Sequence, residues 1–267
     1  MNRTTLASIA AVLGLLVGAP AAAQQRLPAD RRAFLACPIV RDTKTVPCFL
    51  AEMDGELYFL GIQEDTAAAW YPPQLGHKVL VEGTVAPGPR VCGGIVLKPV
   101  VTSVIPELDP SCNTLLPAEE GIDAPDARRG PGPSSVRPAE GAAPAAPPPA
   151  PTPPFQIREF TVPFDFDTDF MPGRMTRVIA DAVRYANAIG SSRIEVTSFR
   201  GATLLSSGET LVEDPRIAER RAKKLHTILI GLGIPATSLT VTWKPDPETP
   251  TGVGDERSRR VVLTVHP

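Results

Sequence analysis

The sequence predicts two folded domains, a small all-β domain followed by an α/β two-layer sandwich, with a proline-rich linker between them. Three observations predict this organisation. Residues 30–116 contain short runs of β-branched and aromatic residues separated by turn residues. Residues 117–154 are rich in Pro and Ala, and residues 155–267 alternate strand-like runs with two segments whose apolar residues recur at helical spacing.

Composition narrows the class of protein. The chain has 267 residues and 31 prolines, where average usage would give roughly 13. Its 27 basic and 29 acidic residues give a net charge of −2, so we expect no nucleic-acid partner, which normally requires a strongly basic surface. Aromatic residues make up 5% of the chain, too few for the two aromatic girdles of a membrane barrel.

Residues 1–23 are typical of a secretory signal peptide. Arg3 supplies the positive start, Leu6 to Val17 form an apolar run, and Ala21 to Ala23 supply the small residues of a cleavage site. The run is shorter than the ~20 residues that span a bilayer, and a retained membrane anchor is the alternative. We therefore expect an exported mature chain without a transmembrane span.

The four cysteines, Cys37, Cys48, Cys92 and Cys112, precede the linker, and none belongs to a Cys-x-x-Cys pair. In an exported protein an even number predicts disulfides, and four cysteines allow three pairings. We expect the pairs that are nearest in sequence, Cys37–Cys48 and Cys92–Cys112. Of the three histidines only His77 lies near these cysteines, so we expect no metal site and no cofactor; redox catalysis is the alternative.

The β domain, residues 30–116, is expected to form a small closed or nearly closed barrel, OB-like in architecture. The segment Lys78 to Val85 alternates apolar and polar residues as a half-buried strand does. Turn residues occur at Asp54-Gly55, at Pro87-Gly88-Pro89 and at Gly93-Gly94. The expected strands are residues 47–53, 56–63, 78–85, 94–101 and 102–108.

The linker, residues 117–154, contains 12 Pro, 9 Ala and 4 Gly. Such a segment cannot bury enough apolar surface to offset the entropy of ordering it. Its end, residues 146–154, favours extended polyproline II and predicts a semi-rigid spacer. A docking site for a proline-recognising domain is the alternative.

The C-terminal block, residues 155–267, is expected to fold in the order β-α-β-α-β-β with both helices on one face of a mixed sheet. The first helix follows Pro172, and a loop from Gly201 to Glu213 precedes the second. Asp214-Pro215 predicts the start of that second helix, and Gly231 to Pro235 predicts its end. The expected strands are residues 157–162, 193–199, 238–243 and 260–265.

One charge in the second helix falls within its apolar stripe. At about 100° per residue, Arg221 lies inside the arc formed by the apolar side chains, whereas its neighbour Arg220 points outside it. A guanidinium so placed is costly unless it reaches water or meets an anion. The partner is either an internal carboxylate, Asp165, Asp167 or Glu213, or the carboxylate of a ligand, which an arginine can bind bidentately.

The C-terminal block resembles the OmpA-like peptidoglycan-binding domain, which is also found in peptidoglycan-associated lipoproteins and flagellar stators. Four stretches carry the resemblance in the family's order: Val162–Asp167 (VPFDFD), Ile217–Ala222 (IAERRA), Leu229–Pro235 (LIGLGIP) and Arg257–Val261 (RSRRV). The resemblance covers the C-terminal block only. It implies the β-α-β-α-β-β sandwich and non-covalent capture of the diaminopimelate residue in the peptidoglycan stem peptide.

The resemblance also implies the ligand-binding residues. Arg221 occupies the place of the family's ligand-binding arginine, and Asp214 that of its asparagine. The family's aspartate, in a Gly-x-Thr-Asp motif after the second strand, is replaced by Gly201 or Leu204, and its role could pass to Glu209, Glu213 or Asp214. Arg200, at the end of the second strand, would favour a more anionic ligand if it contacted one; the alternative is a solvated side chain.

Sequence patterns of catalysis are missing. The chain has no G-x-S-x-G, H-E-x-x-H, P-loop or G-x-G-x-x-G motif, and the acidic run at 165–169 lacks the spacing of an EF-hand. We therefore expect a non-catalytic protein of a Gram-negative envelope, located in the periplasm and associated with the outer membrane. Its C-terminal domain would bind peptidoglycan, and its N-terminal domain another envelope protein. The alternative is an OmpA-like fold that has lost the ligand and binds protein partners.

Overall fold

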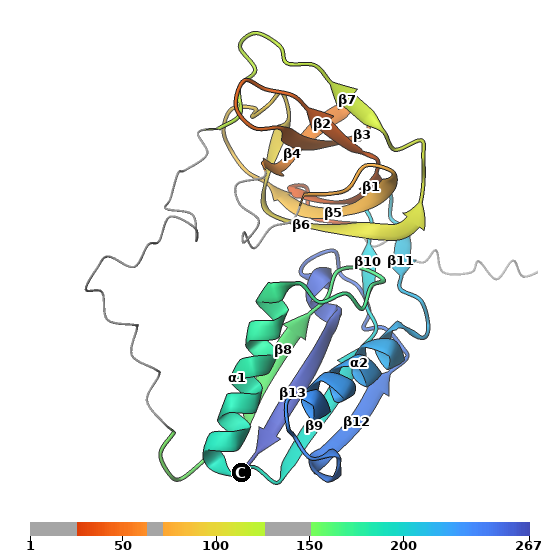
Figure 1. Ribbon diagram of the computed structural model, residues 1–267. Helices are drawn as coiled ribbons and strands as arrows, with labels where there is room; N and C mark the ends of the chain where they lie inside the picture. The colour runs from red at the N-terminus through yellow and green to blue at the C-terminus, as the bar shows by residue number, and fades with distance from the viewer. Residues whose placement is uncertain (1–25, 63–71, 126–150) are drawn as a thin grey trace, which may run out of the picture.

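The computed structural model describes residues 26–62, 72–125 and 151–267, which form a β domain and an α/β domain in direct contact (Figure 1). The expected signal peptide and residues 126–150 of the expected linker lie outside the described residues. In the described ranges, no helix is both long and apolar enough to cross a membrane.

The β domain contains seven strands in one sheet, in the order β1-β5-β6-β4-β3-β2-β7. Sequence patterns predicted β3, β4 and β5 and divided β6, which is a single strand, into two. They did not predict the short strands β1, β2 and β7. The bounds are β1 (Arg31–Ala36), β2 (Pro38–Arg41), β3 (Cys48–Met53), β4 (Glu56–Ile62), β5 (His77–Val85), β6 (Ile95–Leu108) and β7 (Thr114–Leu116).

The closed OB-like barrel that the sequence predicted is not confirmed. Most neighbouring strands are antiparallel, while β4 pairs with β6, and β2 with β7, in parallel. Only Cys37 separates β1 from β2, yet β1 pairs with β5 and β2 pairs with β3. The chain therefore passes from one part of the sheet to another at this cysteine.

Both disulfide pairings expected from the sequence are wrong. Cys37 is bonded to Cys112, with a Cα–Cα distance of 4.7 Å, and Cys48 to Cys92, with a Cα–Cα distance of 6.4 Å. Strand pairing explains the error, because β2 and β3 place Arg41 opposite Cys48. Cys37 lies four positions from Arg41 along the chain, or about 13 Å at ~3.3 Å per residue, which is beyond the reach of a disulfide.

The α/β domain has a four-stranded sheet in the order β12-β9-β13-β8, with both helices on one face (Figure 1). Only β12 and β9 are parallel. Its regular elements are β8 (Arg158–Pro163), α1 (Gly173–Ile189), β9 (Arg193–Phe199), α2 (Ile217–Gly231), β12 (Leu239–Lys244) and β13 (Arg260–His266), with 3₁₀ turns η1 (Ala236–Ser238) and η2 (Asp255–Ser258). This is the β-α-β-α-β-β order predicted from the sequence, with one addition.

The addition is a β-hairpin in the segment that the sequence predicted as a loop. Strands β10 (Ala202–Leu204) and β11 (Thr210–Val212) pair antiparallel between β9 and α2. Figure 1 shows that this hairpin extends from the α/β domain towards the β domain. At the turn after β10, Ser206 donates its backbone N–H to the carbonyl oxygen of Ala33 in β1 (2.7 Å) and accepts the Ala33 N–H on Oγ (3.0 Å).

An apolar cluster joins the two domains. Ala33 and Leu80 of the β domain pack with Phe166 and Leu205 of the α/β domain. This contact corrects the expectation that β5 is half-buried, since residues 79–83 are all buried. The side of β5 that alternation assigns to solvent is covered by the second domain, so the two domains share a core.

Candidate functional site

The candidate site is centred on an ion pair between Arg221 of α2 and Glu213, which follows β11. Arg221 donates from Nη1 to Glu213 Oε2 (3.0 Å) and from Nη2 to Oε1 (2.6 Å), the bidentate geometry in which a guanidinium binds a carboxylate. Both side chains are 0% exposed. In this structure, therefore, an internal carboxylate occupies the position on Arg221 that a ligand carboxylate would need.

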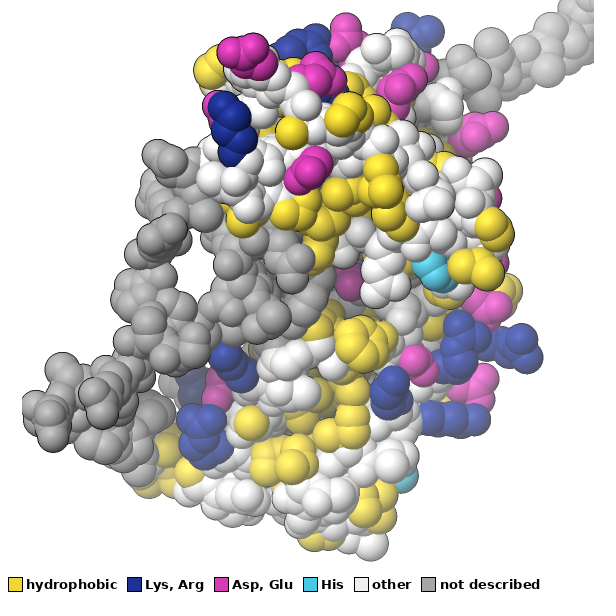
Figure 2. Space-filling model, turned by 45° about the horizontal axis from the view of Figure 1, so that its top comes forward, with side chains coloured by type: hydrophobic (Ala, Val, Ile, Leu, Met, Phe, Trp, Pro, Cys, Tyr) yellow, Lys and Arg dark blue, Asp and Glu magenta, His cyan; other side chains and the backbone are white. Residues whose placement is uncertain are grey.

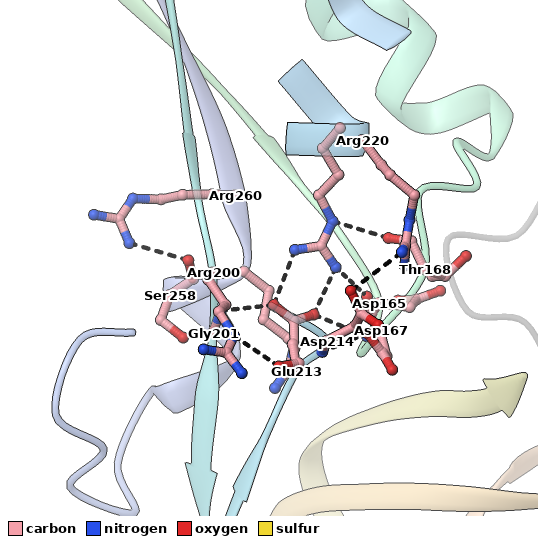
Figure 3. A network of polar contacts seen from close by, with 12 residues as sticks. Asp165, Asp167, Thr168, Arg200, Gly201, Glu213, Asp214, Arg220, Ser258 and Arg260 are labelled. Atoms are coloured by element: carbon pink, nitrogen blue, oxygen red, sulfur yellow. Dashed lines mark hydrogen bonds and ion pairs between the residues drawn. The ribbon is translucent and has the colours of Figure 1, made fainter. Parts of the chain in front are cut away.

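Glu213 is also held by backbone donors. Its Oε1 accepts the N–H of Asp167 (2.8 Å) and its Oε2 accepts the N–H of Gly201 (2.6 Å). Each carboxylate oxygen thus has one guanidinium and one amide donor (Figure 3). Four hydrogen bonds to a buried carboxylate offset much of the cost of removing its charge from water.

The remaining contacts of Arg221 come from the segment after β8. Its Nε donates to the carbonyl of Thr168 (2.9 Å), and its Nη2 donates to that of Asp165 (3.0 Å). The guanidinium carbon lies 4.8 Å from the centre of the Phe164 ring, within the range of a cation–π contact. The VPFDFD stretch of the sequence thus supplies a ring and a carbonyl acceptor to the arginine.

A second buried ion pair lies beside the first and crosses between the domains. Arg259, just before β13, donates to Glu82 of β5 from Nη1 (3.2 Å) and Nη2 (2.5 Å). Their side chains are 0% and 2% exposed. Thr203 of β10 accepts from Arg259 Nη1 (2.9 Å) and donates to Glu82 (3.0 Å), so the inserted hairpin takes part in the contact.

Gly201 lies where the two pairs meet. A Cβ atom built on Gly201 would lie 2.3 Å from Cγ of Arg259 and 3.1 Å from Oε2 of Glu213, so these two side chains are neighbours over the glycine. Glu82, Arg259, Glu213 and Arg221 therefore form a buried row of alternating charge, which we call the charge row. Burial alone would lower the pKa of Arg259, but the charges of Glu82 and then of Glu213 raise it above its ordinary value.

The other residues predicted for the site do not contact the Arg221 side chain through their own side chains. Asp214 accepts the backbone N–H of Arg216 (2.7 Å), which comes just before α2, and pairs with Arg220 (3.2 Å). These hydrogen bonds and charges lower the pKa of Asp214. The helix begins at Ile217, two residues after the predicted start.

Glu209 and Arg200 have other roles. Glu209 is an exposed residue of the β10–β11 turn, where its carbonyl accepts the N–H of Leu205. Arg200 donates from Nε to the carbonyl oxygen of Glu213 (2.7 Å) and from Nη1 to that of Pro245 (3.3 Å). Arg200 thus helps to fix the backbone that carries Glu213.

Sequence reasoning did not identify Glu82, Arg259 or Thr203 as part of the network. Arg259 stood within the RSRRV stretch, but only as a mark of resemblance. The available signal for Glu82 was an acidic residue inside the apolar run of β5, between Val81 and Gly83. Alternation assigned it to the solvent face, and nothing local indicates that a second domain covers that face.

No residue of the charge row lines either of two surface pockets, although Ser258, the neighbour of Arg259, lines one of them. Pockets of about 610 Å³ at the 248–260 loop and about 420 Å³ between Arg26 and the hairpin turn are not lined by Arg221 or Glu213. On the face in Figure 2, Lys and Arg side chains are interspersed with Asp and Glu, and apolar side chains are exposed on both domains. Within the described ranges, His, Cys, Asp and Glu residues form no group that could hold a metal ion.

Comparison with known proteins gives similarity over part of the chain. No family model matches the sequence, and no curated protein matches it. The structure is similar to that of a putative MotB-like protein from Desulfovibrio vulgaris, at 19% identity and a TM-score of 0.33, over 41% of this chain and 75% of that one. It is also similar to the OmpA-like domain of FopA1 from Francisella tularensis, at 17% identity and a TM-score of 0.34, over 41% of this chain and 71% of that one.

Proposed function

We propose that this chain is a non-catalytic protein of the Gram-negative cell envelope whose OmpA-like C-terminal domain is a protein-interaction module. The observation that carries the proposal is the closed pair of Arg221 and Glu213, with both side chains 0% exposed. A ligand carboxylate would have to displace Glu213 from the arginine and from two backbone amides. Glu213 would then be left buried without its counter-charge, which costs on the order of 3–5 kcal/mol.

The hairpin supports a role in protein contact. The resemblance assigns to the segment after β9 the aspartate that helps to hold the ligand. Here that segment begins with Gly201, continues as β10 and β11, and contacts the β domain through Thr203 and Ser206. Residues from the segment that would line a ligand site therefore bind a protein surface, and the first such surface is the chain's own β domain.

The two disulfides are typical of an oxidising compartment, which supports the periplasm as the location, with association to the outer membrane as part of the proposal. We extend the proposal to the β domain, which would engage another envelope protein.

Sedimentation with purified peptidoglycan sacculi tests the proposal. We expect the full-length protein to remain in the supernatant at low salt, with or without excess free meso-diaminopimelate. An Arg220→Ala variant, which removes the exposed neighbour, serves as the matched control for non-specific charge. The proposal would be overturned if the wild-type protein sedimented with the sacculi and free diaminopimelate abolished this sedimentation, while Arg220→Ala sedimented as much as the wild type.

Peptidoglycan binding is the second candidate, and one observation favours it. Glu213 makes with Arg221 the bidentate contact that a diaminopimelate carboxylate would make. If Glu213 moved away, it would leave a guanidinium whose planar orientation is already fixed by Thr168, Asp165 and the Phe164 ring. This second function requires a cause for the movement of Glu213.

A further inference from the structure

The charge row contains two arginines that compete for one glutamate. Arg221 holds Glu213 with two hydrogen bonds, while Arg259 lies beside Glu213 over Gly201 and takes its own counter-charge from Glu82 of the other domain. Each arginine thus has one carboxylate as long as the domains are in contact. The arrangement depends on a residue that the α/β domain does not itself contain.

Arg259 has unused capacity for a second carboxylate. Its Nε–H, buried within the protein, has no hydrogen-bond partner among the described residues. Its Nη1 and Nη2 groups donate to Glu82 and Thr203, and both contacts are made at the domain boundary. A buried guanidinium that loses its counter-charge is strongly destabilised unless it finds another.

From these contacts we infer that Glu82 decides which arginine Glu213 pairs with, and that a shift of the β domain that takes Glu82 away from a still buried Arg259 opens Arg221 as a binding site for a carboxylate. When Glu82 leaves, Arg259 has one buried carboxylate beside it, that of Glu213. As Glu213 turns towards Arg259, Arg221 loses its bidentate partner and can accept the carboxylate of a ligand. This goes beyond the proposed function, and it supplies the movement that the second candidate requires.

The hairpin provides the mechanical link for this exchange. Glu213 directly follows β11, and β10 carries Thr203, which bonds both Glu82 and Arg259. Gly201 donates its N–H to Glu213 and its carbonyl accepts the Glu213 N–H (3.2 Å). Movement of the hairpin on such a shift of the β domain therefore acts directly on the backbone at both sides of the Glu213 carboxylate.

The exposure of Arg221 can be measured in the full-length chain without knowing the ligand. Phenylglyoxal modifies accessible guanidinium groups, and peptide mass spectrometry reports each arginine separately. Glu82→Gln keeps the shape and the acceptor for Thr203 but removes the charge. We expect modification of Arg221 to be on the order of tenfold faster in Glu82→Gln than in the wild-type protein, because the closed pair loses its protection.

Two further variants separate the charge exchange from general loosening. Glu256→Gln is the matched control, because it removes another carboxylate that acts electrostatically on Arg259 without a hydrogen bond to it, and Arg221 should stay protected. In Glu82→Gln/Arg259→Gln the competitor for Glu213 is gone, so Arg221 should become protected again. General loosening of the domain boundary would instead leave Arg221 at least as reactive in the double variant.

The outcomes divide as follows. Reactive Arg221 in Glu82→Gln together with protected Arg221 in the double variant supports the inference. Protected Arg221 in a folded Glu82→Gln protein, or reactive Arg221 in the double variant, overturns it. Protection of the opened Arg221 by free meso-diaminopimelate would support the second candidate function; reactivity that diaminopimelate leaves unchanged would exclude that candidate while the exchange itself stands.

Discussion

Glu82 and Arg259 form an ion pair between two domains, in an environment from which water is almost excluded. The two side chains are 2% and 0% exposed and share the hydroxyl of Thr203. Arg259 stays charged at physiological pH, so where the docked domains exclude water it needs Glu82 as its counter-charge, and loss of either partner leaves the other charge buried and unpaired. The pair therefore makes separation of the domains costly, in addition to the apolar contacts of Leu80 with Phe166 and Leu205.

This pair predicts that the two domains stay together after the chain is cut. With a protease site introduced within residues 126–150, the two fragments should co-elute from a size-exclusion column after cleavage. Glu82→Ala should weaken this association by about 3–5 kcal/mol, because it leaves Arg259 unpaired at the boundary. Glu107→Ala, at an exposed position of β6, is the control and should leave co-elution unchanged. Fragments that separate in the wild-type protein would contradict the prediction.

The pair of Arg221 and Glu213 predicts a non-additive effect on stability. Arg221→Met should lower the free energy of unfolding by about 3–5 kcal/mol, because Glu213 stays buried without its counter-charge. Adding Glu213→Leu should recover much of this loss, since both charges are then replaced by apolar side chains. Urea denaturation of the two variants measures the difference. A double variant less stable than Arg221→Met would show that the carboxylate is held by its amide donors alone.

Two of the four residues of the charge row could be identified from the sequence. Helical phase identified Arg221 as a charge in an apolar stripe, and Glu213 was among the carboxylates considered for it. These are local patterns within one domain. Glu82 and Arg259 are 177 positions apart. Their contact depends on how the two domains dock, and a local sequence pattern cannot predict that docking.

The same limit explains the errors in the β domain. Alternation in β5 correctly predicted a strand, but it cannot show that its second face packs on another domain. Sequence distance was a poor guide to the disulfides, because strand pairing separates Cys37 from Cys48 and brings it to Cys112, 75 residues away. The C-terminal elements were predicted well, since caps, glycines and prolines mark their ends locally.

The disulfides predict a fragment pattern and a stability effect. Digestion without reduction should yield peptides that join Cys37 to Cys112 and Cys48 to Cys92. Replacing either pair by alanine should cost about 4 kcal/mol of stability. Each disulfide closes a loop, of 75 or 44 residues, and so removes a similar amount of conformational entropy from the unfolded chain, which the variant regains. Peptides that join Cys37 to Cys48 would contradict the strand pairing as well as the bonds.

Replacing Asp167 by Asn should stabilise the protein in a pH-dependent way. Partial burial, with the nearby charges of Glu213 and Asp214, raises its pKa. A carboxyl whose pKa is raised by folding stabilises the protein below its unfolded pKa and loses that contribution as the pH rises through the folded pKa. Asp167→Asn should therefore raise the Tm at neutral pH by about 1–2 °C, or ~0.5 kcal/mol, and the gain should vanish near pH 3.

The backbone at position 167 suits this substitution. Its φ is 54°, a conformation that Asn adopts as readily as Asp, and the amide oxygen can still accept the N–H of Asp214.

Asp214→Asn is the control, and its effect on stability should have the opposite sign. The pKa of Asp214 is lowered, first by the Arg216 N–H, so its replacement should lower the Tm at neutral pH and have no effect in acid. Equal signs for the two variants would contradict the assignment.

Gly201 predicts the cost of filling the space between the two ion pairs. In Gly201→Ala the new Cβ would lie 2.3 Å from Cγ of Arg259 and 2.9 Å from Oγ of Ser258, and both side chains are buried. Either the guanidinium of Arg259 moves away from Glu82 or the backbone of Gly201 moves away from Glu213. We expect a loss of about 3 kcal/mol in the free energy of unfolding. Gly231→Ala is the matched control, since its Cβ would meet nothing within 4 Å, and it should be neutral or stabilising by up to ~1 kcal/mol.

Because the charge row is continuous, Gly201→Ala should also raise the reactivity of Arg221 towards phenylglyoxal, whereas Gly231→Ala should not. Equal stability of the two alanine variants would show that Arg259 and Glu213 can separate without cost, and that the charge row does not act as a unit.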